Sequence, residues 1–160
     1  MKKKILALIL AIASVFMLLT SCEIIDILDD PEVSDEGAVT VVVENYDGSY
    51  DVYEVSLSEV ENKDEGAEGI IEHLNQKKGL YLEMVDSTYG AYVSAVGSIK
   101  ENYTEATYVI VYTSIATDSY QGAPTVDYNG TTLYQAGVGL SGMSVDAGTV
   151  ILFRAEKSPY

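Results

Sequence analysis

The chain has 160 residues, which is enough for one folded domain in addition to a targeting segment. It carries 25 acidic and nine basic residues, a formal net charge of −16, with one histidine and one cysteine. Such an acidic surface repels nucleic-acid phosphates and anionic lipid headgroups, so we expect no nucleic-acid partner.

The first residues have the layout of an export signal. Lysines at positions 2–4 precede an apolar run at positions 5–19, which only Ser14 interrupts. The run is about 15 residues long, shorter than the roughly 20 that a membrane-spanning helix needs. A basic start followed by a short apolar run is typical of a signal peptide, which we place at residues 1–21.

The end of this run is more specific. Leu19-Thr20-Ser21-Cys22 resembles the lipobox of bacterial lipoprotein signals, in which the cysteine thiol receives diacylglycerol and becomes the first residue after cleavage. Cys22 is the only cysteine, so no internal disulfide can form, and lipidation would remove a free exported thiol. We therefore expect an extracytoplasmic protein that lipid on Cys22 anchors to the membrane of a bacterial cell envelope. The alternatives are an ordinary signal peptide with an unrelated cysteine, or an uncleaved anchor.

Residues 22–37 are predicted to be a lipidated cysteine and an acidic tether. The segment is rich in acids and contains Pro31, a composition that disfavours compact structure. Four apolar residues depart from this pattern and could instead lie at the membrane surface: Ile24, Ile25, Ile27 and Leu28.

The folded domain is expected at residues 38–160, beginning with a hairpin. Apolar and polar side chains alternate on both sides of Asp47-Gly48, which is a hairpin turn signal. The apolar positions are Val39, Val41 and Val43 in the first strand, and Tyr53, Val55 and Leu57 in the second.

One clear helix follows the hairpin. Ala67, Ile70, Ile71 and Leu74 form a single apolar stripe, and Gly79 is the expected C-cap. The lone His73 lies on this helix and is interpreted as a surface residue, because the sequence supplies no partner for a metal or catalytic role. Residues 61–72 resemble a calcium loop only loosely, with a lysine where an oxygen ligand should be, so no metal site is predicted.

The second half is predicted to be mostly strands. They are expected at residues 81–84, 89–96, 108–112, 131–135 and 149–155, the last after an Asp146-Ala147-Gly148 turn. Residues 114–130 are interpreted as a long loop, which is often functional in compact domains. A hairpin, a helix and further strands predict an α+β fold, specifically a β-grasp-like mixed sheet packed on a single helix.

Motifs for catalysis are largely missing. The sequence has no G-x-S-x-G, H-E-x-x-H or phosphate-loop pattern, and no second histidine or cysteine for a catalytic pair. The segment from Gly137 to Gly142 matches G-x-G-x-x-G in letters, but it does not belong to a βαβ unit and is interpreted as a turn. We expect a protein that is not an enzyme and that carries no cofactor.

The positive signal is tyrosine. The chain has 13 tyrosines and no tryptophan. Tyrosine offers a large flat side chain with a polar tip and little entropy to lose, which suits contact surfaces. Tyr89, Tyr92, Tyr120 and Tyr128 are the candidate ligand-binding residues, whereas core packing is at least as good an interpretation of Tyr108 and Tyr112.

A set of features in the second half resembles a known family. They are Ser87-Thr-Tyr-Gly-Ala-Tyr-Val93, Gly97, the Tyr108 strand, and the spacing from Val138 to the Asp146-x-Gly148 turn. Together they resemble the transcobalamin-like C-terminal domain, a domain of unknown function in bacterial surface proteins, over roughly residues 38–156. Members often carry tryptophan in the strand that matches Tyr108, where this chain has tyrosine.

The resemblance implies a β-grasp-like fold related to the small domain that caps cobalamin in vertebrate carriers. Those carriers hold cobalamin between this domain and a large helical one, so weak binding is expected from this domain alone. Two hypotheses follow. The first is a surface module that binds a small molecule, such as a corrinoid, with or without another protein. The second is a protein-interaction or cell-surface structural module that binds through a sheet edge or the tyrosine-rich loop.

Overall fold

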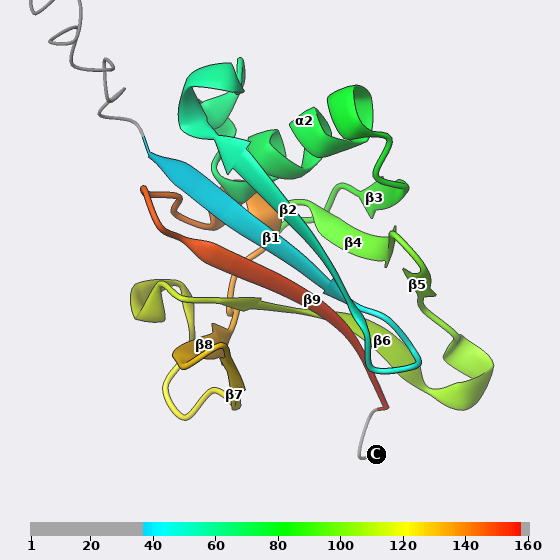
Figure 1. The fold of residues 1–160 in the computed structure, drawn as a ribbon. Helices are drawn as coiled ribbons and strands as arrows, with labels where there is room; N and C mark the ends of the chain where they lie inside the picture. The colour runs from blue at the N-terminus through cyan, green and yellow to red at the C-terminus, as the bar shows by residue number, and fades with distance from the viewer. Residues whose placement is uncertain (1–36, 158–160) are drawn as a thin grey trace, which may run out of the picture. The chain divides into compact units, whose positions relative to one another are not determined.

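The computed structural model describes residues 37–157, which form two sheets and one α-helix (Figure 1). The helix is α2 (Ala67–Lys78). The strands are β1 (Ala38–Glu44), β2 (Tyr50–Ser56), β3 (Leu82–Val85), β4 (Tyr92–Val96), β5 (Ile99–Lys100), β6 (Thr107–Thr113), β7 (Thr125–Tyr128), β8 (Thr131–Gln135) and β9 (Val150–Lys157). The signal peptide, Cys22 and nearly all of the tether lie outside the described residues. Within residues 37–157, no helix is long and apolar enough to cross a membrane.

The larger sheet has six strands in the order β2-β1-β9-β6-β8-β7. β1 runs parallel to β9, and the other neighbours are antiparallel, so the sheet is mixed. The smaller sheet is antiparallel, in the order β3-β4-β5. The α+β prediction of a mixed sheet with a single helix is confirmed for the part of the chain that the structure describes.

The main hydrophobic core lies between the large sheet and a layer formed by α2 and the small sheet (Figure 1). The predicted apolar stripe of the helix is fully buried there: Ala67, Ile70, Ile71 and Leu74. The helix ends as predicted, because Gly79 takes the left-handed conformation that a C-cap requires, with φ of 72°. The three valines predicted to share one face of β1 also lie in this core.

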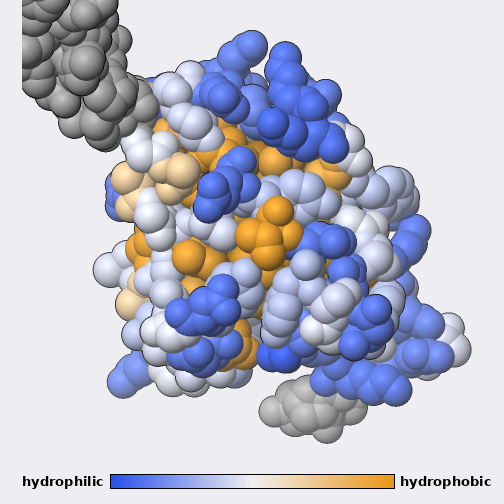
Figure 2. All heavy atoms as spheres, viewed as in Figure 1, coloured by the Kyte–Doolittle hydropathy of each residue, from blue (hydrophilic) through white to orange (hydrophobic). Residues whose placement is uncertain are grey.

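A second, smaller core covers the opposite face of the large sheet. Val42, Tyr112, Leu133 and Leu152 are its buried members. The two edge strands of the sheet, β2 and β7, approach each other on this side. The rings of Tyr50 on β2 and Tyr128 on β7 lie edge to face with centroids 5.4 Å apart. The large sheet is therefore strongly curled. Seen from the side of Figure 1, a mainly hydrophilic surface surrounds scattered hydrophobic patches (Figure 2).

The prediction of a loop at residues 114–130 is wrong at its C-terminal end. Residues 125–128 form strand β7, which pairs with β8 in a hairpin. Asn129 and Gly130 are the two turn residues, with φ of 50° and 81°. An Asn-Gly pair with positive φ at both positions is the preferred two-residue hairpin turn. From the sequence alone, this turn signal lies at the end of a predicted loop, and the strand before it is missed.

Candidate functional site

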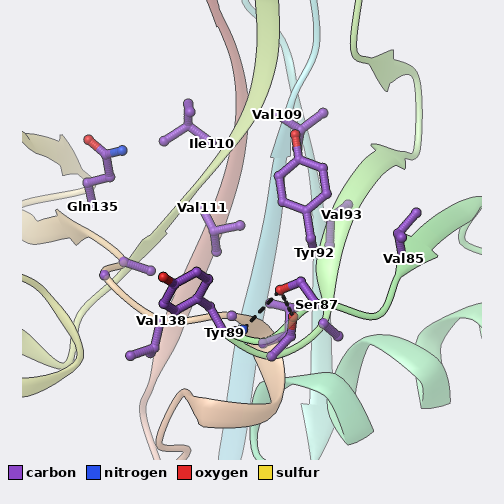
Figure 3. A pocket seen from close by; sticks show the side chains of 16 residues that line it. Val85, Ser87, Tyr89, Tyr92, Val93, Val109, Ile110, Val111, Gln135 and Val138 are labelled. Carbon is purple, nitrogen blue, oxygen red and sulfur yellow. Dashed lines mark hydrogen bonds between the residues drawn. The ribbon is translucent and has the colours of Figure 1, made fainter.

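A groove of about 390 Å³ lies between β6 and the segment that leads into β4 (Figure 3). We call this cavity the groove. Three stretches of chain line it: residues 85–93 apart from Asp86 and Thr88, residues 109–111 of β6, and residues 135–140 from the end of β8 onward. Its volume is within the usual range of small-molecule pockets, and the lining is mainly apolar.

The floor of the groove is closed by a tight crossing of two backbone segments. The Gly139 N–H donates to the Tyr89 carbonyl oxygen at 2.8 Å, and the Leu140 N–H donates to the Ala91 carbonyl oxygen at 3.0 Å. A Cβ atom at Gly139 would lie 2.6 Å from the carbonyl carbon of Gly90, which is closer than real Cβ contacts. The crossing therefore requires glycine at position 139.

Side-chain hydroxyls hold the loop that enters this crossing. The Ser87 hydroxyl donates to the Gly90 carbonyl oxygen at 2.6 Å and accepts from the Tyr89 N–H at 3.2 Å (Figure 3). The Ser141 hydroxyl accepts from the Ala91 N–H at 3.1 Å. These bonds fix the turn that presents Tyr89, so that residue is placed by its backbone rather than by packing of its ring.

Two of the four predicted tyrosines line the groove together. Tyr89 is 83% exposed and Tyr92 is 38% exposed, and their rings project from one segment on either side of Val111 (Figure 3). Tyr89 can present nearly all of its flat ring to a ligand, and Tyr92 can present the exposed part of its side chain.

The other two predicted tyrosines lie outside the groove. The Tyr120 hydroxyl donates to the Gln135 side-chain oxygen at 3.2 Å, and Tyr128 packs against Tyr50 where the sheet ends meet. The four residues thus do not form one site. Tyr112 is a core residue, 2% exposed, and its hydroxyl donates to the Glu156 carboxylate at 2.7 Å.

The groove lining contains no charged residue, but acids gather beyond one end of it. Glu68 bonds the Ser141 hydroxyl, which in turn holds Ala91 of the lining. Burial raises the pKa of Glu68, and the nearby carboxylates of Glu72, Glu65 and Asp86 raise it further, against the opposing effect of the Ser141 bond. Within residues 37–157, no three His, Cys, Asp or Glu side chains gather in a way that could hold a metal ion.

Two of the three groove walls were not predicted from the sequence. Residues 137–142, predicted to be a turn, do form a loop and a short 3-10 turn, but this loop also closes the groove. The predicted strand at residues 108–112 is β6, and its residues 109–111 form a second wall that the sequence did not single out. The available signal was the close spacing of three glycines, because glycine often marks a site where another backbone approaches closely.

Comparisons with known proteins give a likeness of fold. No protein-family model matches the chain. No curated protein matches it either. Among solved structures, a suggested metal-binding protein of Ruminococcus gnavus ATCC 29149 aligns with a TM-score of 0.51 and 12% identity, over 77% of this chain and 99% of that one.

Haptocorrin in complex with Cbi aligns with a TM-score of 0.49 and 14% identity. The alignment covers 76% of this chain and 25% of haptocorrin, so the chain spans about a quarter of that protein's length. At these identities the comparisons concern the architecture and carry no function over to this chain.

Proposed function

We propose that the chain is a non-catalytic binding module that lipid on Cys22 anchors outside the cytoplasm, at the membrane of a bacterial cell envelope. The groove is its binding site. The observation that carries this proposal is the uncharged, mainly apolar cavity of about 390 Å³ with Tyr89 and Tyr92 exposed beside it. Exposed tyrosines next to a formed cavity are typical of a contact surface.

The ligand that fits is a small molecule with a flat or apolar surface and polar groups at its edge. Apolar surface would contact Val85, Val111 and Val138, and edge groups would meet the tyrosine hydroxyls. A corrinoid is such a molecule, and the resemblance to the transcobalamin-like domain favours it. The groove would cover only part of so large a ligand, so we expect modest affinity unless another protein completes the site.

Titration with cobalamin, followed by its visible absorbance, tests the ligand. We expect saturable spectral changes, and Tyr89→Ala and Tyr92→Ala should each weaken the affinity by about two- to tenfold, since stacking of a flat ligand on a tyrosine ring contributes about 0.5–1.5 kcal/mol. Tyr46→Ala is the matched control, because Tyr46 is 65% exposed and neither it nor its hydrogen-bond partner Lys100 belongs to the lining. No spectral change at millimolar cobalamin would refute the corrinoid.

Membrane attachment needs a separate test. Mass spectrometry of the mature protein from its native envelope should find diacylglyceryl on Cys22 at the new N-terminus. A Cys22→Ser variant should then appear in the soluble fraction of the envelope. Recovery of the native protein without fatty acid, or with residues before Cys22 still attached, would contradict the proposed anchor.

A further inference from the structure

Every second residue of β6 directs its backbone N–H and C=O groups toward the groove. In an antiparallel ladder, successive residues direct their N–H and C=O groups to opposite sides of the strand. Beyond the end of β6, the Ser114 N–H bonds Val150 of β9 at 3.0 Å, so even-numbered residues face β9. The Val111 carbonyl oxygen accepts from the Ala136 N–H on the other side at 2.9 Å, so odd-numbered residues face the groove.

This side of β6 has a gap in its pairing. At one end, Thr107 exchanges both backbone bonds with Asn102 at 2.9 Å. At the other end, β8 pairs only with Tyr112 and Thr113. Between them, within residues 37–157, Val109 has no strand partner on the groove side although it is only 4% exposed. Buried backbone groups are nearly always paired, so this gap is a place for a partner that brings its own backbone.

We propose that the groove receives an extended peptide segment of another protein, which adds as a strand to β6 beside Val109. Its alternate apolar side chains contact the groove lining, and its lysine or arginine residues lie toward the acidic end. The inference relies on the groove being the binding site, as proposed above, and does not depend on the corrinoid.

Charge complementarity identifies a cationic peptide. The lining itself is uncharged, so the stretch of peptide inside it must be uncharged as well. Asp86 stands between the lining residues Val85 and Ser87 and is exposed. Glu68 is linked to the lining residue Ala91 through the Ser141 hydroxyl, and the carboxylates of Glu72, Glu65 and Asp86 act on it. An anionic peptide would meet repulsion at this end, whereas a basic one is attracted.

A peptide titration tests the proposal. The probe is a short synthetic peptide of alternating valine and threonine with lysine at both ends, measured by calorimetry against the full chain. In the first variant peptide, the amides that face β6 while the valines occupy the groove are N-methylated. This peptide should bind at least tenfold more weakly, because methylation removes a hydrogen-bond donor and blocks the strand edge. In the control peptide, the intervening amides, which point away from β6, are N-methylated, and the affinity should stay unchanged. The first peptide cannot recover its bonds by shifting one residue, because that shift would turn the valines out of the groove.

Amide hydrogen exchange supplies a second, independent measurement. In the free protein the Val109 amide should exchange faster than its neighbour Ile110, which bonds β9, and saturating peptide should slow Val109 at least tenfold while Ile110 stays constant. Equal binding of both methylated peptides, or protection of Val109 equal to that of Ile110 without peptide, overturns the inference. Cobalamin binding with no peptide binding overturns this inference alone, whereas failure of both ligands overturns the proposed function as well.

Discussion

Substitution of Gly139 by alanine is a direct test of how the groove is built. The added methyl group would lie 2.6 Å from the Gly90 carbonyl carbon, 2.7 Å from the Tyr89 carbonyl oxygen and 2.8 Å from the Gly90 Cα. All three atoms belong to the backbone, so no side chain can rotate away to make room. The two segments would have to separate, and the bonds from Gly139 to Tyr89 and from Leu140 to Ala91 would lengthen or break.

The expected cost is about 3 kcal/mol of unfolding free energy. Forced overpacking contributes about 1–3 kcal/mol, and each weakened backbone bond contributes about 1 kcal/mol. That sum is a large part of the roughly 5–15 kcal/mol by which domains of this size are stable. Urea unfolding followed by far-ultraviolet circular dichroism measures it, and the midpoint should fall by about 1–2 M with an unchanged slope.

Gly142→Ala is the matched control within the same glycine-rich segment. A methyl group there would lie 3.4 Å from the Val138 Cβ, an ordinary contact, and its free energy of unfolding should stay within about 0.5 kcal/mol of that of the unaltered chain. Equal urea midpoints for the two variants would contradict the predicted backbone clash at Gly139. Full stability of Gly139→Ala would contradict the predicted clash as well, because the two backbone segments would then have room for a Cβ atom at position 139.

Three further predictions concern the parts of the fold that support the site. Gly69→Ala should destabilise the protein by about 1–3 kcal/mol in urea unfolding although alanine favours helix, because its Cβ would lie 2.0 Å from the Asn62 carbonyl oxygen. Burial, followed by the bond to a carboxylate, raises the pKa of Tyr112 above its ordinary 10.0, so the folded chain keeps a proton that the unfolded chain releases. Stability measured against pH should therefore fall above about pH 10, and less steeply in Tyr112→Phe. A double-mutant cycle with Tyr50→Ala and Tyr128→Ala should give a coupling of about 0.5–1.5 kcal/mol, and a value near zero would contradict the contact between the sheet ends.

The parts of the fold that sequence predicted well are those specified locally. The helix stripe from Ala67 to Leu74 and its Gly79 cap are adjacent in the chain, so periodicity and a single conformational preference identify them. The same holds for the β1–β2 hairpin, whose alternating residues pair around one turn. The β7–β8 hairpin was missed because Val126 and Tyr128 are only half-buried and alternate over just four residues, which is too short a pattern to outweigh a polar setting.

The groove was predicted only in part, for a physical reason. Tyr89 and Tyr92 could be singled out because they belong to one short segment, Ser87 to Val93, which resembles a known family. Tyr120 and Tyr128 were candidates because they lie in a polar predicted loop, yet their positions depend on how a hairpin pairs with β6 and on how far the sheet curls. The residues beside each tyrosine do not determine such long-range strand pairing. Local sequence therefore could not show that Tyr89 and Tyr92 line the groove while Tyr120 and Tyr128 do not.

The same long-range pairing explains why a groove exists at all. β8 joins β6 through only two residue pairs and then leaves the sheet at Ala136. Had the ladder continued, the chain after Ala136 would have covered Val109 and filled the cavity. Instead residues 137–140 turn to cross the Tyr89 segment, and Gly139 allows that crossing at backbone contact distance. The strand edge is thus left open beside an uncharged lining, where an occupant with its own hydrogen-bonding groups gains more than a purely apolar one.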